Sequence, residues 1–263
     1  MGERAMTGAE VLEEQYAGTG RLHARQSLWD LRSGPPLRTV VLDRAGLAGT
    51  ESVVDVGCGN GIYLAELRRR GHVGPVLGID RSVGMAGHSR AHAATAVADA
   101  QALPLKDGSV DVVLSLHMLY HVPDVPKAVA ELRRVLRPGG TAMVTTNGPG
   151  HSAEAKRVLL TAAQQVAGLG DGDLDWDNRR FSPAVARQVL GAVFDDVDEH
   201  LTGDAVHVPD PAVVAEYIAS WPPESIGLTE GPQWQEIVAA TAGILSHHES
   251  FTVTSQVAVY RCS

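Results

Sequence analysis

The chain has 263 residues, 44% of them hydrophobic, and a formal net charge of −9 at pH 7. This length and apolar content suffice for one large domain with additions, and no stretch approaches the roughly 20 consecutive apolar residues that a membrane-spanning helix needs. An acidic chain without a basic stripe excludes nucleic acid as the expected partner, because phosphate contacts need clustered Lys and Arg side chains.

The N-terminus and the cysteines predict a cytoplasmic protein with no membrane attachment. Residues 1–6 contain neither the apolar core of a signal peptide nor the Ser or Thr that a myristoylation site carries at position six. The chain has two cysteines, Cys58 and Cys262, which fits a reducing compartment and excludes a cysteine zinc site. We expect a monomer or a homodimer.

The residues before Val53 read as an N-terminal helical layer. Helical spacing extends over residues 9–16, 22–31 and 37–45, and two prolines precede the last of these segments. Glycines at positions 46 and 49 then end it.

A strand, a glycine-rich turn and a helix come next. The β-branched residues Val53, Val54 and Val56 are typical of a strand buried on both faces of a parallel sheet, and helical spacing resumes at Leu64. Between them, glycines at positions 57, 59 and 61 let the backbone turn sharply and let a ligand approach the main chain. This turn predicts a site for a nucleotide-like ligand, but Ile62 stands where the dinucleotide fingerprint has its third glycine, which disfavours a nicotinamide.

Two further strands end in acidic residues. Residues 75–80 read as a strand, and Asp80 lies nineteen residues beyond Gly61, where a Rossmann-like fold places its ribose-binding acid. Ser82 can cap a helix that runs to about Ala93, and a third strand over residues 94–98 precedes Asp99.

The middle of the chain continues the alternation of strand and helix. A fourth strand ends in the polar group 115–121, a helix covers 125–136, and Pro138 to Gly140 stop it before a strand over 141–146. This rhythm predicts a parallel doubly wound sheet, whose ligands bind beyond the carboxyl ends of the strands.

After Asn147 the pattern changes. The expected elements are helices over 153–167, 183–192 (capped by Ser182), 212–220 and 233–247, and strands over 193–201 and 251–260. We expect the last strands to form an antiparallel edge. The acidic loop 171–177 lacks the ligand pattern of a calcium site, and the adjacent residues His247 and His248 point apart on one helix, so no metal is expected.

The stretch 52–146 carries a series of motifs in a specific order. They are Asp55-Val56-Gly57-Cys58-Gly59-Asn60-Gly61, Asp80 after the second strand, Val97 to Pro104 with Asp99, Gly108 to Val113, and Leu136-Arg137-Pro138-Gly139-Gly140. The series resembles class I S-adenosylmethionine-dependent methyltransferases, and most of all their small-molecule branch of quinone and natural-product biosynthesis.

This resemblance implies an α/β fold: a Rossmann-like, doubly wound sheet of seven strands, mostly parallel with an antiparallel last strand, plus a helical cap. The methyltransferase core is expected over residues 51–263, with helical insertions at about 148–180 and 203–248. Residues 1–50 are expected to form a helical lid, with Tyr16 and Arg25 facing the cofactor.

The resemblance also implies a site for S-adenosylmethionine, with S-adenosylhomocysteine as the product. Asp80 would accept both ribose hydroxyls and Asp99 the adenine amino group, while Met85 and Leu103 would sandwich the adenine. The other residues expected at the cofactor are Tyr16, Arg25, Asp55, Gly57, Cys58, Gly59, Arg81, Ala100, Gln101, Ser115 and Leu116. For two of these residues a structural role stays open: Asp55 can orient the helix, and Met85 can fill the core.

The leading functional hypothesis is methyl transfer to an oxygen, nitrogen or carbon nucleophile of a small metabolite. Where some amino-group methyltransferases carry Asn/Asp-Pro-Pro-aromatic, this chain has residues 115–118, Ser-Leu-His-Met, which favours a small acceptor. If a proton must leave the acceptor, the candidate bases are His117 and His121, with Tyr120 as an orienting hydroxyl. The alternatives are a nicotinamide-dependent oxidoreductase and a non-catalytic S-adenosylmethionine-binding protein.

Overall fold

The computed structural model describes residues 20–174 and 180–263, which divide into two compact units. The sheet unit comprises residues 35–149, 180–202 and 257–263, and the helical unit comprises residues 20–34, 150–174 and 203–256. The helix expected over 9–16 and the end of the acidic loop lie outside the described residues. None of the described helices is both long and apolar enough to span a bilayer.

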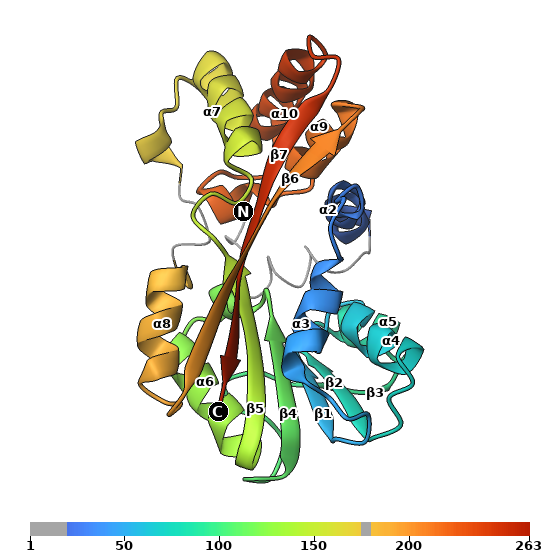
Figure 1. The fold of residues 1–263 in the computed structure, drawn as a ribbon. Helices are drawn as coiled ribbons and strands as arrows, with labels where there is room; N and C mark the ends of the chain where they lie inside the picture. Colours follow the sequence, from blue (N-terminus) through green and yellow to red (C-terminus); the bar gives the residue numbers. More distant parts are fainter. Residues whose placement is uncertain (1–19, 175–179) are drawn as a thin grey trace. The chain divides into compact units, whose positions relative to one another are not determined.

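A seven-stranded mixed sheet runs through the fold (Figure 1), with the strand order β3-β2-β1-β4-β5-β7-β6. The strands are β1 (Val53–Val56), β2 (Val76–Asp80), β3 (Ala94–Val97), β4 (Val110–Leu116), β5 (Leu136–Asn147), β6 (Val197–Val208) and β7 (Phe251–Cys262). Strands β1 to β5 pair in parallel, and β7 pairs antiparallel with β5. This Rossmann-like architecture with an antiparallel last strand confirms the predicted fold class.

Several predicted boundaries were wrong. Strand β6 ends at Val208 and not at residue 201, and three other differences have a local hydrogen bond or strand pairing as their cause. Strand β5 begins at Leu136, which pairs with Val110, so the Pro-Gly-Gly segment lies inside the strand. Strand β6 begins four residues later than predicted, because the N–H groups of residues 193 and 194 still bond back to Leu190 at the end of a helix. Helix α5 (Val83–Ser89) ends four residues early in a turn closed by His92 and Ser89.

Helices cover both faces of the sheet within the sheet unit. Helices α3 (Leu37–Ala45) and α4 (Ile62–Arg69) pack on one face, and α6 (Val125–Val135) and α8 (Pro183–Gly191) on the other (Figure 1). Strand β1 is buried at all four positions, as its β-branched sequence predicts. Asp124, Ser82 and Ser182 cap helices with their side chains, and the last two do so as predicted.

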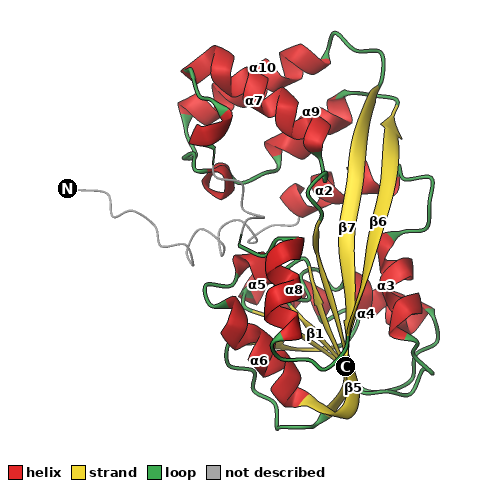
Figure 2. Ribbon diagram, turned by 60° about the vertical axis from the view of Figure 1, so that its left-hand side comes forward, coloured by secondary structure: helices red, strands yellow, loops and turns green. Residues whose placement is uncertain are grey.

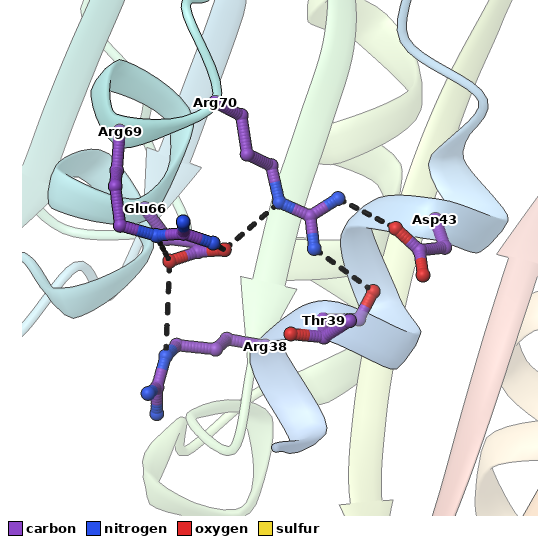
Figure 3. Close-up of polar contacts among 6 residues, drawn as sticks. All are labelled: Arg38, Thr39, Asp43, Glu66, Arg69 and Arg70. Atoms are coloured by element: carbon purple, nitrogen blue, oxygen red, sulfur yellow. Dashed lines mark hydrogen bonds and ion pairs between the residues drawn. The ribbon is translucent and has the colours of Figure 1, made fainter. Parts of the chain in front are cut away.

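A charged cluster joins α3 to α4 (Figure 3). The carboxylate of Glu66 accepts hydrogen bonds from Arg69 at 2.6 and 2.8 Å and from Arg70 at 2.9 Å. Arg70 also donates to Asp43 at 2.6 Å, and Arg38 lies 3.9 Å from Glu66. These contacts tie together two helices on one face of the sheet, of which α4 follows the glycine loop directly.

The helical unit has its own apolar core. Helices α2 (Gly20–Asp30), α7 (Ala153–Ala167), α9 (Ala212–Ala219) and α10 (Pro232–Leu245) contribute to it (Figure 2). Leu28 on α2 is fully buried among their side chains. The unit is assembled from three separate stretches of chain, and the predicted role of residues 1–50 as a lid stays a prediction.

Candidate cofactor site

The glycine loop after β1 needs its glycines for two physical reasons. Gly57, Gly59 and Gly61 have φ angles of 78°, 54° and 80°, in the left-handed region that side chains disfavour. A Cβ on Gly57 would also lie 2.7 Å from Met118, and one on Gly61 would lie 2.9 Å from Ser89. The loop is therefore both turned and tightly packed.

The N–H groups of the loop are used inside the protein. Those of Gly57 and Cys58 donate to the Ile79 carbonyl at 2.7 and 3.0 Å, and that of Gly59 donates to Asp80 at 2.9 Å. The Gly61 N–H donates to the carbonyl of Cys58 at 2.9 Å. A pyrophosphate-binding loop would need such donors for its anion, so this loop does not present them to a phosphate.

Asp80 is held at the end of β2 by backbone donors. Its Oδ1 accepts from the Ser82 N–H at 2.8 Å and its Oδ2 from Gly59. Burial raises the pKa of Asp80 above its ordinary value, although these N–H groups partly offset the effect. Each carboxylate oxygen keeps acceptor capacity, so a fixed Asp80 suits a ligand with two neighbouring hydroxyls.

Asp55 lies inside β1 with a side chain that is 1% exposed. Its Oδ2 has no hydrogen-bond partner among the described residues. Burial, and then the charge of Asp80, raise the pKa of Asp55 to about 7. Two acids, Asp55 and Asp80, therefore lie near the glycine loop, and no cation among the described residues contributes to the pKa shift of Asp55.

The turn after β4 forms a wall beside the glycine loop. His117 has a φ of 54°, an uncommon conformation for a residue with a side chain. Its N–H donates to the Thr145 hydroxyl on β5 at 3.0 Å, and the next residue, Met118, packs against Gly57. The rings of Tyr120 and His121 meet edge to face with centroids 4.5 Å apart.

Comparison with known proteins places the chain in a family. Residues 54–144 match the family described as "Methyltransferase domain". A Mycolicibacterium smegmatis protein named "Probable S-adenosylmethionine-dependent methyltransferase" is 31% identical over 186 residues, which cover 59% of this chain and 70% of that protein. The chain belongs to the class I S-adenosylmethionine-dependent methyltransferases. S-adenosylmethionine, the cofactor expected from the sequence, is the cofactor of this family.

Other similarities are shorter or concern the fold alone. Ubiquinone biosynthesis O-methyltransferase of Pseudomonas paraeruginosa is 37% identical over 123 residues, 42% of this chain and 50% of that protein. The chain spans about half or less of the length of several such curated relatives. The crystal structure of the [4+2]-cyclase SpnF matches with a TM-score of 0.62 at 21% identity, covering 99% of this chain and 97% of that one.

The residues expected at the adenine lie in two places of the sheet unit: Asp99, Gln101 and Leu103 follow β3, and Met85 lies in α5. The Asp99 carboxylate accepts from the Gln101 N–H at 2.9 Å and from the Gln101 side chain. Burial acts to raise the pKa of Asp99, but the hydrogen bonds from Gln101 and the charge of Arg81 outweigh it and leave the pKa below its ordinary value. Met85 and Leu103 are both buried, and their expected contact with adenine stays a prediction.

The remaining predicted residues have different surroundings. Ser115 and Leu116 are buried at the end of β4, and the Ser115 hydroxyl has no partner among the described residues. The thiol of Cys58 points to Ser89 at 3.5 Å, and burial raises its pKa to about 12, so it is not a thiolate at neutral pH. Arg25, in the helical unit, donates to the Ser220 carbonyl at 2.8 Å, and Tyr16 lies outside the described residues.

Two residues at the site escaped the sequence analysis. Thr145 read as one more position of a buried strand, and Met118 as part of a polar stretch. Only the pairing of Leu116 with Thr145 reveals that the Thr145 hydroxyl reaches the His117 N–H. Over the described part of the chain, no group of three or more His, Cys, Asp or Glu side chains is arranged to hold a metal ion.

Proposed function

We propose that the chain transfers the methyl group of S-adenosylmethionine to an oxygen, nitrogen or carbon nucleophile of a small metabolite. The observation that carries the proposal is Asp80, fixed at the end of β2 by the N–H groups of Gly59 and Ser82. A carboxylate fixed beside the glycine loop suits the ribose diol of the cofactor. S-adenosylmethionine supplies a methyl group on a sulfonium that becomes a neutral thioether.

The small-metabolite acceptor rests on two observations. The chain is acidic, with a net charge of −9, which disfavours a polyanionic substrate. Ubiquinone biosynthesis O-methyltransferase, one of the relatives, is named for a step in the synthesis of a small molecule. The match to that relative covers 42% of this chain, so the proposal includes oxygen, nitrogen and carbon as acceptor atoms.

The residues of the chain would act mainly by positioning. Methyl transfer is an in-line displacement, so holding the acceptor close to the methyl carbon and in line with sulfur supplies much of the acceleration. His117, at the end of β4 beside the glycine loop, is our candidate base for an acceptor that must lose a proton. His121 and Tyr120, whose rings meet edge to face a few residues later, are the second candidates.

Calorimetry and turnover test the proposal. S-adenosylmethionine and S-adenosylhomocysteine should bind and NAD should not, and a panel of metabolites should yield S-adenosylhomocysteine in the presence of the protein.

The Asp80→Ala variant should lose about 1.5–3 kcal/mol of cofactor affinity, the scale of charged hydrogen bonds left unmade. Asp195→Ala, at an exposed position of the same unit, is the control. Unchanged affinity in Asp80→Ala would overturn the proposed site, and binding without turnover of any acceptor would favour a non-catalytic binding protein.

A further inference from the structure

Thr145 carries a hydroxyl at a position of β5 where its neighbours are apolar. The residue is fully buried, and it pairs with Leu116 on β4 and with Val259 on β7. Both partners belong to the apolar cluster that includes side chains of α3 and α4, and residues paired across strands share one face of the sheet. A hydroxyl buried there costs free energy unless it is hydrogen-bonded, so its partner indicates its role.

The partner of this hydroxyl is the backbone N–H of His117, the first residue after β4. The Thr145 hydroxyl oxygen accepts that N–H at 3.0 Å, while the Thr145 carbonyl lies farther from the same nitrogen, at 3.4 Å. At this point the chain leaves the sheet, with a φ of 54° at His117 that few residues with a side chain adopt. The hydroxyl therefore holds the chain where it turns away from the strand.

The turn places Met118 against the glycine loop. A Cβ on Gly57 would lie 2.7 Å from both the Cβ and the Cγ of Met118, so Met118 fills the space beside this glycine. On its other side Gly57 is bonded through its N–H to the Ile79 carbonyl at 2.7 Å. A continuous series of contacts thus leads from Thr145 through His117 and Met118 to the loop after β1, all within the sheet unit.

We infer that Thr145 is a positioning residue of the cofactor site. Its hydroxyl fixes the turn at His117, and the turn holds Met118 against Gly57 in the loop where the cofactor is expected. Thr145 contacts no ligand in this arrangement and acts through these two neighbours. Without the hydroxyl the turn can relax and the loop loses part of its preorganisation, which costs binding free energy. The inference rests on the proposed function, because it assigns a role within the same site.

The variant Thr145→Val keeps the shape of the side chain and removes the hydroxyl. It should bind S-adenosylmethionine about three- to tenfold more weakly than wild type, the scale of one hydrogen bond. Thr145→Ser, which keeps the hydroxyl, should bind within about twofold of wild type. Titration calorimetry on the full chain measures both affinities without an acceptor, at a temperature well below the melting temperature of each variant.

The neighbouring Thr146 offers a matched control. It is also fully buried in β5, and its hydroxyl donates to the Phe181 carbonyl. Because side chains alternate along a strand, Thr146 lies on the opposite face from Thr145, together with its partner Ala258. Thr145→Val and Thr146→Val should both lower the melting temperature, but only Thr145→Val should weaken cofactor binding.

A double-mutant cycle with Met118→Ala tests the route through the turn. Met118→Ala alone should weaken cofactor binding, and in its presence Thr145→Val should change the affinity by less than about twofold, because the contact that the hydroxyl supports is already lost. Equal cofactor affinity in Thr145→Val and Thr146→Val, no rescue by Thr145→Ser, or additive effects with Met118→Ala would overturn the inference while leaving the proposed function intact. Failure of the wild type to bind S-adenosylmethionine would overturn both.

Discussion

At the scale of single residues, Gly57 links the glycine loop to the turn after β4. Its φ of 78° disfavours any side chain, and an added Cβ would meet Met118 at 2.7 Å. We expect Gly57→Ala to cost about 2–4 kcal/mol of stability from left-handed strain and overpacking together, and to weaken cofactor binding. Urea unfolding measures the cost. Gly87→Ala, where a Cβ in α5 meets nothing, should be neutral or stabilising, and equal effects of the two changes would contradict this account.

His117 is the residue on which the chemistry of the acceptor depends most directly in our proposal. Its conformation is held by the Thr145 hydroxyl. With an acceptor that must lose a proton, His117→Ala should lower turnover by about 10²-fold or more while keeping cofactor affinity. The assay follows S-adenosylhomocysteine formation across pH, with His121→Ala for comparison. A loss of turnover of only a few-fold would mean that His117 forms part of the pocket wall and that positioning of the acceptor, without a base, accounts for the rate.

Asp55 should also leave a signature in the stability of the ligand-free protein. Its pKa of about 7 in the folded state lies above the ordinary value near 4, so the folded state holds the proton more tightly than the unfolded state. The resulting stability is complete below about pH 4 and is lost as the pH rises to about 7. Asp55→Asn should therefore raise the melting temperature more at pH 8 than at pH 5, as measured by thermal unfolding in both buffers. An equal difference in melting temperature between variant and wild type at pH 5 and pH 8 would show that the pKa of Asp55 is not raised in the folded state.

At the scale of elements, the cluster around Glu66 joins α3 to α4 (Figure 3). Hydrogen bonds from Arg69, with further ones from Arg70, lower the pKa of Glu66 to about 2 despite burial. A lowered pKa means that the stabilisation is complete above the ordinary value of 4.5 and is lost as the pH falls towards 2.

We expect Glu66→Gln to lower the free energy of unfolding by about 1–3 kcal/mol at pH 7. The difference from wild type should shrink as the pH is lowered from 4.5 to 2, in denaturant titrations at each pH. Asp43→Asn, at the exposed end of the same cluster, should cost less than about 1 kcal/mol. A difference between Glu66→Gln and wild type that persists at pH 2 would show that the charge of Glu66 is not the source of the effect.

At the scale of the whole molecule, the question is what the segment before β1 does. Deleting residues 1–34 is a poor test of a lid, because Leu28 on α2 is fully buried in the core of the helical unit. Arg25 offers a sharper test, since its guanidinium donates to the Ser220 carbonyl at the end of α9, where a cation also suits the helix dipole.

If the lid prediction is right, Arg25→Ala should weaken cofactor binding by about tenfold or more, the scale of a charged hydrogen bond. Calorimetry measures the affinity and thermal unfolding the stability of the same variant. Arg157→Ala, with a side chain that is 70% exposed on α7, is the control. A lower melting temperature with unchanged affinity would assign Arg25 to the packing of α9 alone.

The sequence by itself determined those features of the fold that have a local cause. The positive φ angles of the glycine turn, the burial of β1 and the capping of α5 and α8 by Ser82 and Ser182 depend on neighbours within a few residues. The alternation of strand and helix then predicts the parallel sheet, and with it the places of Asp80 and Asp99 at strand ends. These features also carry the family resemblance.

The tertiary structure alone decided which distant groups meet. Thr145 reaches His117, and Met118 reaches Gly57, through strand register and loop packing that no local pattern encodes. The extension of β5 back to Leu136 also comes from pairing with a neighbouring strand, which overrides the local Pro-Gly-Gly signal. In the sequence, Asp55 is one acid among valines. Its raised pKa depends on its burial, on the charge of Asp80 and on the lack of a described hydrogen-bond partner for its Oδ2 atom, all of which are set by the tertiary structure.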